Sequence, residues 1–184
     1  MKERPILFNG EMVKAILEGR KTQTRRVVRG RWALDFLQPG GFSPRYVALP
    51  ENYLSPYGYS GDLLWVRETW APELWDNAHP LPGDPIIYRE DYCGEALDYP
   101  WKPSIFMPRW ASRITLKIIN VRVERLQEIS EEDAINEGAA FRKGEWGEMD
   151  AFNYIWDSIN AKRGYSWDSN PWVWVIEFEM VKGG

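Results

Sequence analysis

The segment from Ser112 to Leu126 carries the clearest pattern in the chain and limits what the rest can fold into. Apolar and polar residues alternate along it, and the phase of the alternation changes halfway: Ile114, Leu116 and Ile118, then Ile119, Val121 and Val123. Strand side chains alternate between two faces, so the pattern predicts a long strand with a bulge or bend at the phase change. A fold organised around a sheet is therefore expected.

Further strands are predicted over residues 6–8, 63–68 and 172–178, with weaker signals at 45–49 and 86–88. Three helices are predicted from their capping residues and apolar stripes. The first follows Asn9 and ends at Gly19, the second runs from Ser130 to Gly138, and the third covers residues 148–160.

These elements show no βαβ alternation, which favours an α+β fold: a mostly antiparallel β-barrel with flanking short helices. A chain of 184 residues with 44% hydrophobic content is expected to form one domain over residues 1–184. Segments of about 30–60 and 71–110 are rich in glycine, proline and aromatic residues. They are interpreted as long, ordered loop insertions.

Several classes of protein are disfavoured by composition. No run approaches the roughly 20 apolar residues of a membrane span, and the first residues lack the apolar core of a signal peptide, so a cytoplasmic protein without membrane contact is expected. One cysteine, Cys93, excludes an internal disulfide, and one histidine, His79, excludes paired-histidine catalysis. We predict no metal, no cofactor and no obligatory protein partner.

Positive charge is concentrated near the first predicted helix. Although the chain has a net charge of −4, Glu18 is the only acid among a group of seven cations: Lys14, Arg20, Lys21, Arg25, Arg26, Arg29 and Arg31. The net charge argues against broad, sequence-independent binding to long nucleic acids. A compact basic pocket or short groove remains open, as does simple capping of the helix by Arg20 and Lys21.

The 11 tryptophans have two competing interpretations, which are stacking on nucleobases and plain packing. Four lie within strand or helix patterns and are assigned to the core: Trp65, Trp156, Trp172 and Trp174. Five others lie in or beside loops and are better placed for stacking: Trp32, Trp70, Trp75, Trp101 and Trp110.

Lys21 and Thr24 are candidates for acid/base chemistry. A regular strand would place them on opposite faces, so they converge only if the chain turns between them. Partial burial would lower the pKa of the lysine toward that of a general base. The alternatives are an exposed, solvated lysine and, for Glu137, a solvated carboxylate at a helix end.

Three motifs together resemble the ASCH domain family, which has a PUA-like β-barrel fold. They are the run from Gly19 through Lys21 and Thr24 to Arg26, the Gly61-Asp62 turn leading into Leu64-Trp65-Val66-Arg67, and the segment from Val123 to Asn136-Glu137-Gly138. The chain looks like the longer variant of bacteria and phages, with its 71–110 insertion and its Asn170-Pro171-Trp172-Val173-Trp174 ending.

The resemblance implies binding of RNA or a modified nucleoside, and hydrolysis of N(4)-acetylcytidine to cytidine and acetate. By motif position it implies three catalytic residues: Lys21 as base, Thr24 as nucleophile or water-orienting hydroxyl, and Glu137 as proton shuttle. Substrate contacts are predicted at six further residues: Arg20, Arg25, Arg26, Trp65, Arg67 and Trp70. The alternatives are a non-catalytic RNA-binding module and a ribonuclease.

Overall fold

The computed structural model describes residues 1–73, 79–92, 99–139 and 147–181. Seven strands lie in this part of the chain: β1 (Glu3–Leu7), β2 (Gln23–Val27), β3 (Leu63–Arg67), β4 (Trp70–Pro72), β5 (Ile86–Tyr88), β6 (Thr115–Arg125) and β7 (Trp172–Val181). Five form one sheet in the order β1-β3-β6-β7-β2, and β4 pairs with β5 separately. All pairs are antiparallel except β1 with β3.

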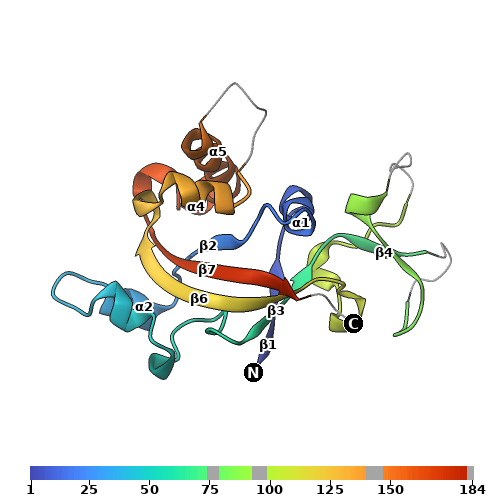
Figure 1. The fold of residues 1–184 in the computed structure, drawn as a ribbon, viewed down its shortest axis with the longest axis horizontal. Helices are drawn as coiled ribbons and strands as arrows, with labels where there is room; N and C mark the ends of the chain where they lie inside the picture. Colours follow the sequence, from blue (N-terminus) through green and yellow to red (C-terminus); the bar gives the residue numbers. More distant parts are fainter. Residues whose placement is uncertain (74–78, 93–98, 140–146, 182–184) are drawn as a thin grey trace.

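Five α-helices accompany the strands: α1 (Gly10–Leu17), α2 (Arg31–Phe36), α3 (Pro44–Val47), α4 (Glu131–Asn136) and α5 (Glu148–Asn160). Figure 1 shows α4 and α5 on one side of the curved strands β6 and β7, and α2 on the other side. The β4–β5 pair projects from one end of the molecule. It belongs to the predicted 71–110 insertion, and α2 and α3 belong to the predicted 30–60 insertion.

The phase change in the long strand is a β-bulge, as predicted. The pairing of β6 with β7 shifts between Ile118 and Asn120. The extra residue, Ile119, is 44% exposed, whereas Ile118 and Val121 on either side of it belong to the same apolar core. A bulge of one residue is what keeps both halves of the strand facing that core.

The three predicted helices are confirmed. The side chain of Asn9 accepts a hydrogen bond of 2.9 Å from the Met12 amide at the start of α1, and Gly19 ends the helix region with φ of 72°. Ser130 caps α4 by accepting from the Asp133 amide. The third helix, α5, has the predicted bounds of residues 148–160.

Two predictions need correction, and a third is shown only in part. Residues 45–49 do not form a strand, because Ser43 caps the Tyr46 amide and Pro44 begins the short helix α3. No strand was predicted over Gln23–Val27, and Lys21 and Thr24 were expected to meet only through a turn between them; the structure has strand β2 from Gln23 onward. The sheet is mostly antiparallel, as predicted, but its order leaves β1 and β2 as edges, so closure into a barrel is not shown.

Two apolar cores lie on the two faces of the sheet. Alternate residues of β7 divide between them: Trp174 and Ile176 join the core under α1 and β1, whereas Val173 and Val175 join the core under α4 and α5. The division follows from the alternation of strand side chains. The two faces of β2 therefore meet different surroundings.

The tryptophans differ in how far they are buried. Trp65, Trp156 and Trp174 are buried as predicted, and Trp172 packs against the first core while partly exposed. Trp32 is 73% exposed, whereas Trp70 is buried. Trp75 and Cys93 lie outside the described residues. None of the helices described has both the length and the apolar character needed to cross a membrane.

Candidate functional site

Lys21 is buried at the junction between α1 and β2. The amides of Arg20 and Lys21 both donate to the carbonyl of Ala15, at 2.8 and 3.0 Å, which folds the chain back across the end of α1. Only 2% of Lys21 is exposed, so the alternative of a solvated lysine is wrong. Its Nζ donates to the Oε2 of Glu137 at 2.7 Å and to the Glu137 carbonyl at 2.8 Å.

Glu137 is held in place by the end of α4. It is the C-terminal cap of that helix and forms an isolated backbone bridge with Lys21. Gly138 follows with φ of 76°, and a Cβ there would lie 3.0 Å from the Ala15 Cβ and 3.1 Å from the Lys21 Cβ. Glycine at this position therefore allows α4 to approach α1 and Lys21 closely. Glu137 is 8% exposed, which overturns the alternative of a solvated carboxylate.

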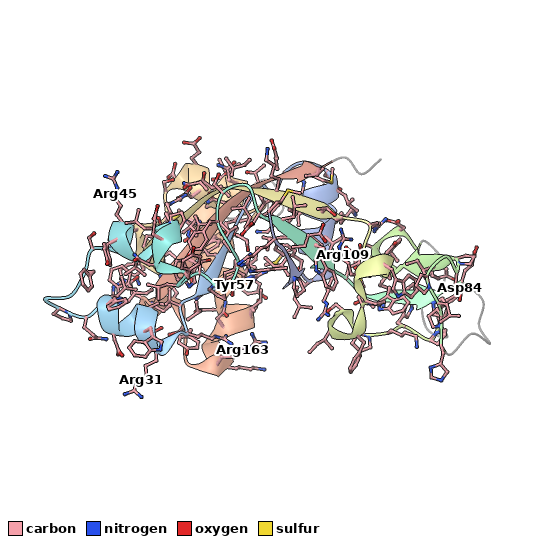
Figure 2. All side chains as sticks on the ribbon, turned by 90° about the horizontal axis from the view of Figure 1, so that it is seen from below. Arg31, Arg45, Tyr57, Asp84, Arg109 and Arg163 are labelled. Atoms are coloured by element: carbon pink, nitrogen blue, oxygen red, sulfur yellow. The ribbon has the colours of Figure 1, made fainter. Side chains whose placement is uncertain are left out.

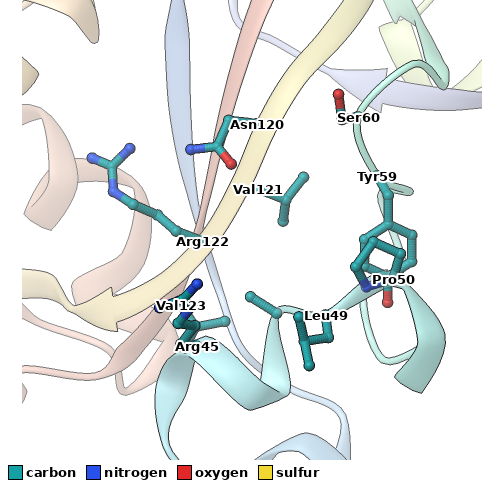
Figure 3. A pocket seen from close by; sticks show the side chains of 10 residues that line it. Arg45, Leu49, Pro50, Tyr59, Ser60, Asn120, Val121, Arg122 and Val123 are labelled. Carbon is teal, nitrogen blue, oxygen red and sulfur yellow. The ribbon is translucent and has the colours of Figure 1, made fainter.

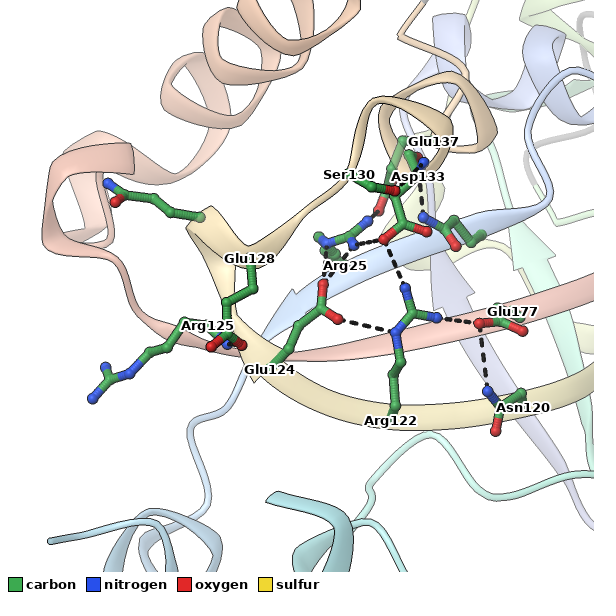
Figure 4. A network of polar contacts seen from close by, with 12 residues as sticks. Arg25, Asn120, Arg122, Glu124, Arg125, Glu128, Ser130, Asp133, Glu137 and Glu177 are labelled. Atoms are coloured by element: carbon green, nitrogen blue, oxygen red, sulfur yellow. Dashed lines mark hydrogen bonds and ion pairs between the residues drawn. The ribbon is translucent and has the colours of Figure 1, made fainter. Parts of the chain in front are cut away.

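A network of alternating charges surrounds this pair (Figure 4). The Nη1 of Arg25 lies 3.3 Å from the Oε1 of Glu137, and its Nη2 contacts Glu124 at 2.5 Å and Asp133 at 2.7 Å. Arg122 lies between Glu124, Asp133 and Glu177. The side chain of Arg25 has no exposed area and faces three carboxylates, so its charge is balanced within the protein.

The surroundings of Lys21 and Asp133 lower the pKa values of both side chains. Burial lowers the pKa of Lys21; the charge of Glu137 opposes this shift, and those of Arg26 and Arg25 add to it. A lysine with a lowered pKa can release its proton closer to neutral pH. Burial acts to raise the pKa of Asp133, but hydrogen bonds and charges from Gln23, Arg25 and Arg122 hold it below its usual value.

Thr24 is buried, with 1% of its surface exposed, and lies on the other face of β2 from Arg25. Thr24 pairs with Ile176 and Arg25 with Val175, and these two partners belong to different cores. Across the described ranges, no hydrogen bond joins the Thr24 hydroxyl to Lys21 or Glu137. The structure thus brings together the lysine and the glutamate of the predicted trio.

The other predicted residues lie in four different places. Arg20 is exposed and paired with Glu18 at 2.5 Å. Arg26 donates to the Leu7 carbonyl at 2.7 Å, so it links the two edge strands of the sheet.

Arg67 lies at the end of β3, with its guanidinium 4.8 Å from the ring centre of Trp65. Trp70 is buried in a separate cluster with Met107 and Ala111. The substrate contacts assigned to these side chains stay predictions.

Two cavities adjoin near the buried pair. The first, of about 360 Å³, is lined by residues of α1 and α5 and by the segment that directly follows α4, among them Glu137, Gly138 and Phe152. The second, of about 540 Å³, lies between the edge strands β1 and β2 and is lined by Arg25, Arg26, Arg29, Arg67 and Arg163 with several apolar side chains. Asn9 and Met12 line both cavities, which therefore adjoin, and we call the two together the groove. Glu137 lines the first cavity, whereas Lys21 lies behind it and belongs to neither lining.

A third cavity, of about 380 Å³, lies between α3 and β6 (Figure 3). Arg45, Pro50 and Val123 line it, and no residue of the Lys21–Glu137 pair does. We therefore place the candidate site in the groove.

Sequence reasoning missed Arg122, Glu124 and Asp133. A usable signal exists, since Arg122 and Glu124 occupy the polar phase of β6 opposite Val121 and Val123. Asp133 lies three residues after Ser130, a spacing typical of a capping box, so the sequence pattern assigns it to the helix start alone. In the described residues no group of three or more histidine, cysteine, aspartate or glutamate side chains has a metal-binding arrangement.

No family model and no curated protein matches the sequence. Solved structures resemble the fold. An ASCH domain from Lactobacillus crispatus JV V101 matches over 97% of this chain and 79% of its own length, with 13% identity and a TM-score of 0.45. A DUF984 protein from Enterococcus faecalis V583 matches over 98% and 80%, with 11% identity and a TM-score of 0.46.

Proposed function

We propose that the protein binds RNA or a modified nucleoside in the groove beside the Lys21–Glu137 pair and removes the acetyl group from N(4)-acetylcytidine. The sheet would then be a PUA-like barrel left open between β1 and β2, with the ligand in the opening. The observation that carries the proposal is the buried contact of 2.7 Å between Lys21 and Glu137, because Glu137 also lines the first of the two adjoining cavities. Both residues were singled out by the sequence motifs.

The pair supplies what amide hydrolysis requires. Lys21, with its lowered pKa, takes a proton from a water molecule or from the Thr24 hydroxyl as that oxygen forms a bond to the acetyl carbon. The proton passes across the short contact to Glu137 and on to N4 of the base, while the bond between N4 and the acetyl carbon breaks. Acetate leaves directly when water attacks, or after water hydrolyses an acetyl-threonine.

Turnover of N(4)-acetylcytidine by the purified protein tests this proposal. We expect Lys21→Met and Glu137→Gln each to lower kcat/KM by about 10²–10⁴-fold, the range typical of lost general acid/base catalysis. Glu132→Gln is the matched control, because Glu132 is an exposed residue of the same helix. Far-UV circular dichroism verifies that each variant is folded. The proposal is wrong if both site variants keep the wild-type rate.

A second candidate function is RNA binding without catalysis. It is favoured by the position of Thr24, whose hydroxyl makes no hydrogen bond to Lys21 or Glu137 in the described chain. In that case short RNAs bind with an affinity that falls steeply with salt, and no product forms. Product detection by mass spectrometry during binding distinguishes the two functions.

A further inference from the structure

We infer that the cavity between β1 and β2 binds a phosphate group, so that the ligand of the groove is a nucleotide rather than a bare nucleoside. The inference rests on the proposed function and specifies its substrate class. A nucleotide is a nucleoside that carries at least one phosphate, either free or at an RNA end.

The first support is uncompensated charge. The cavity is lined by five arginines and by no aspartate or glutamate. Arg25 is balanced by its three carboxylates, but the other four form no ion pair with any described residue: Arg26, Arg29, Arg67 and Arg163. In a chain with 27 acidic and 23 basic residues, such a group attracts an anion.

The second support is a buried donor that lacks an acceptor. The Nε of Arg67 is buried and has no hydrogen-bond partner in the described structure, although Arg67 lines the cavity. A buried polar group without a partner is costly and rarely persists without a reason. A small shift of the Arg67 side chain would turn this Nε toward a phosphate oxygen in the cavity, and the planar guanidinium suits phosphate geometry.

Arg26 and Tyr57 support the same conclusion. Arg26 is desolvated against the Phe8 ring and its pKa is lowered by burial, so a bound anion would stabilise its charged form. Burial raises the pKa of Tyr57, which keeps its hydroxyl neutral and able to donate. Tyr57 and Arg163 line the same cavity, whereas Arg45, labelled with them in Figure 2, lines a different one.

The cavity also has room and walls for the rest of a nucleotide. Its volume of about 540 Å³ lies in the range of small-molecule sites. Phe8 and Trp156 contribute aromatic surface to it, and Asn9 and Met12 connect it to the cavity that contains Glu137. A ligand held by its phosphate among the arginines can therefore extend toward the buried pair.

Isothermal titration of the full chain with four probes tests the inference: N(4)-acetylcytidine, its 5′-monophosphate, cytidine 5′-monophosphate and inorganic phosphate. We expect the acetylated monophosphate to bind about tenfold or more tightly than the bare nucleoside. Arg163→Met, at an exposed position, and Arg67→Met should each remove most of this difference. Arg163→Met should also leave nucleoside affinity unchanged. Arg45→Met is the control, because Arg45 lines a different cavity.

The possible results separate this inference from the proposed function. If nucleoside and monophosphate bind equally, or if both arginine variants keep the difference, the phosphate site is refuted while acetylcytidine hydrolysis stands or falls on its own assay. Equal affinity for inorganic phosphate and for the monophosphates also refutes the inference, because the site would then not recognise a nucleotide. Failure of all four probes to bind contradicts both proposals.

Discussion

Gly138→Ala tests how closely α4 must approach Lys21. The backbone at Gly138 has φ of 76°, which costs an alanine about 1–2 kcal/mol. The added Cβ would also lie 3.0 Å from the Ala15 Cβ and 3.1 Å from the Lys21 Cβ. Overpacking of this kind typically costs about 1–3 kcal/mol more. We therefore expect the free energy of unfolding to fall by about 2–5 kcal/mol, measured by urea denaturation.

Gly19→Ala provides the matched control. Gly19 has nearly the same backbone conformation, with φ of 72°, but an added Cβ there meets nothing within 4 Å. Only the backbone cost of about 1–2 kcal/mol should appear. The difference between the two variants therefore isolates the packing cost. Equal losses, within about 0.5 kcal/mol, would refute the argument that α4 and Lys21 are in close contact.

Three further predictions concern the charges. Lys21→Met should lose stability relative to wild type as pH rises toward 10.5. The cause is that the unfolded lysine binds more protons than the folded one in that range, so the wild type gains stability there. A constant difference between the urea midpoints of the two proteins would contradict this. Asp133→Asn should be less stable than wild type above pH 3.8. This difference in stability should vanish as pH falls through the lowered pKa of the aspartate, which thermal unfolding scans at several pH values measure. Arg122→Met should cost about 1–2 kcal/mol, since the side chain is 30% exposed, and less in 1 M salt; a salt-independent cost would indicate packing instead.

Elements whose apolar spacing matches their local structure were predictable. The stripe and caps of α1, the Ser130 cap of α4 and the length of α5 follow from residues that are neighbours in sequence. Strand β2 was not predicted, because Gln23, Arg25 and Arg26 look like solvated residues. Partners more than 100 positions away cover two of them: Arg25 contacts the carboxylates of Asp133 and Glu137, and Gln23 donates to the backbone carbonyl of Asp133.

The site was predictable only in part for the same reason. The contact between Lys21 and Glu137 joins two motifs that are 116 residues apart. The motifs identified both residues, but no local pattern indicates that they touch. Arg25 differs because its sequence surroundings suggest an exposed cation. In the structure it is the buried centre of an ion-pair network with Glu124 and Asp133. Partners of this kind depend on strand register, which residue spacing alone does not give.

The bulge in β6 also decides which side chains reach the site. Because Ile119 adds one residue, Val121 and Val123 face the apolar core while Arg122 and Glu124 face α4. Deletion of Ile119 would exchange the two sets and turn an arginine and a glutamate into the apolar interior. The register of this one strand thus decides which charges lie beside the Lys21–Glu137 pair. Single-residue insertions and deletions in β6 should therefore be far less tolerated than substitutions.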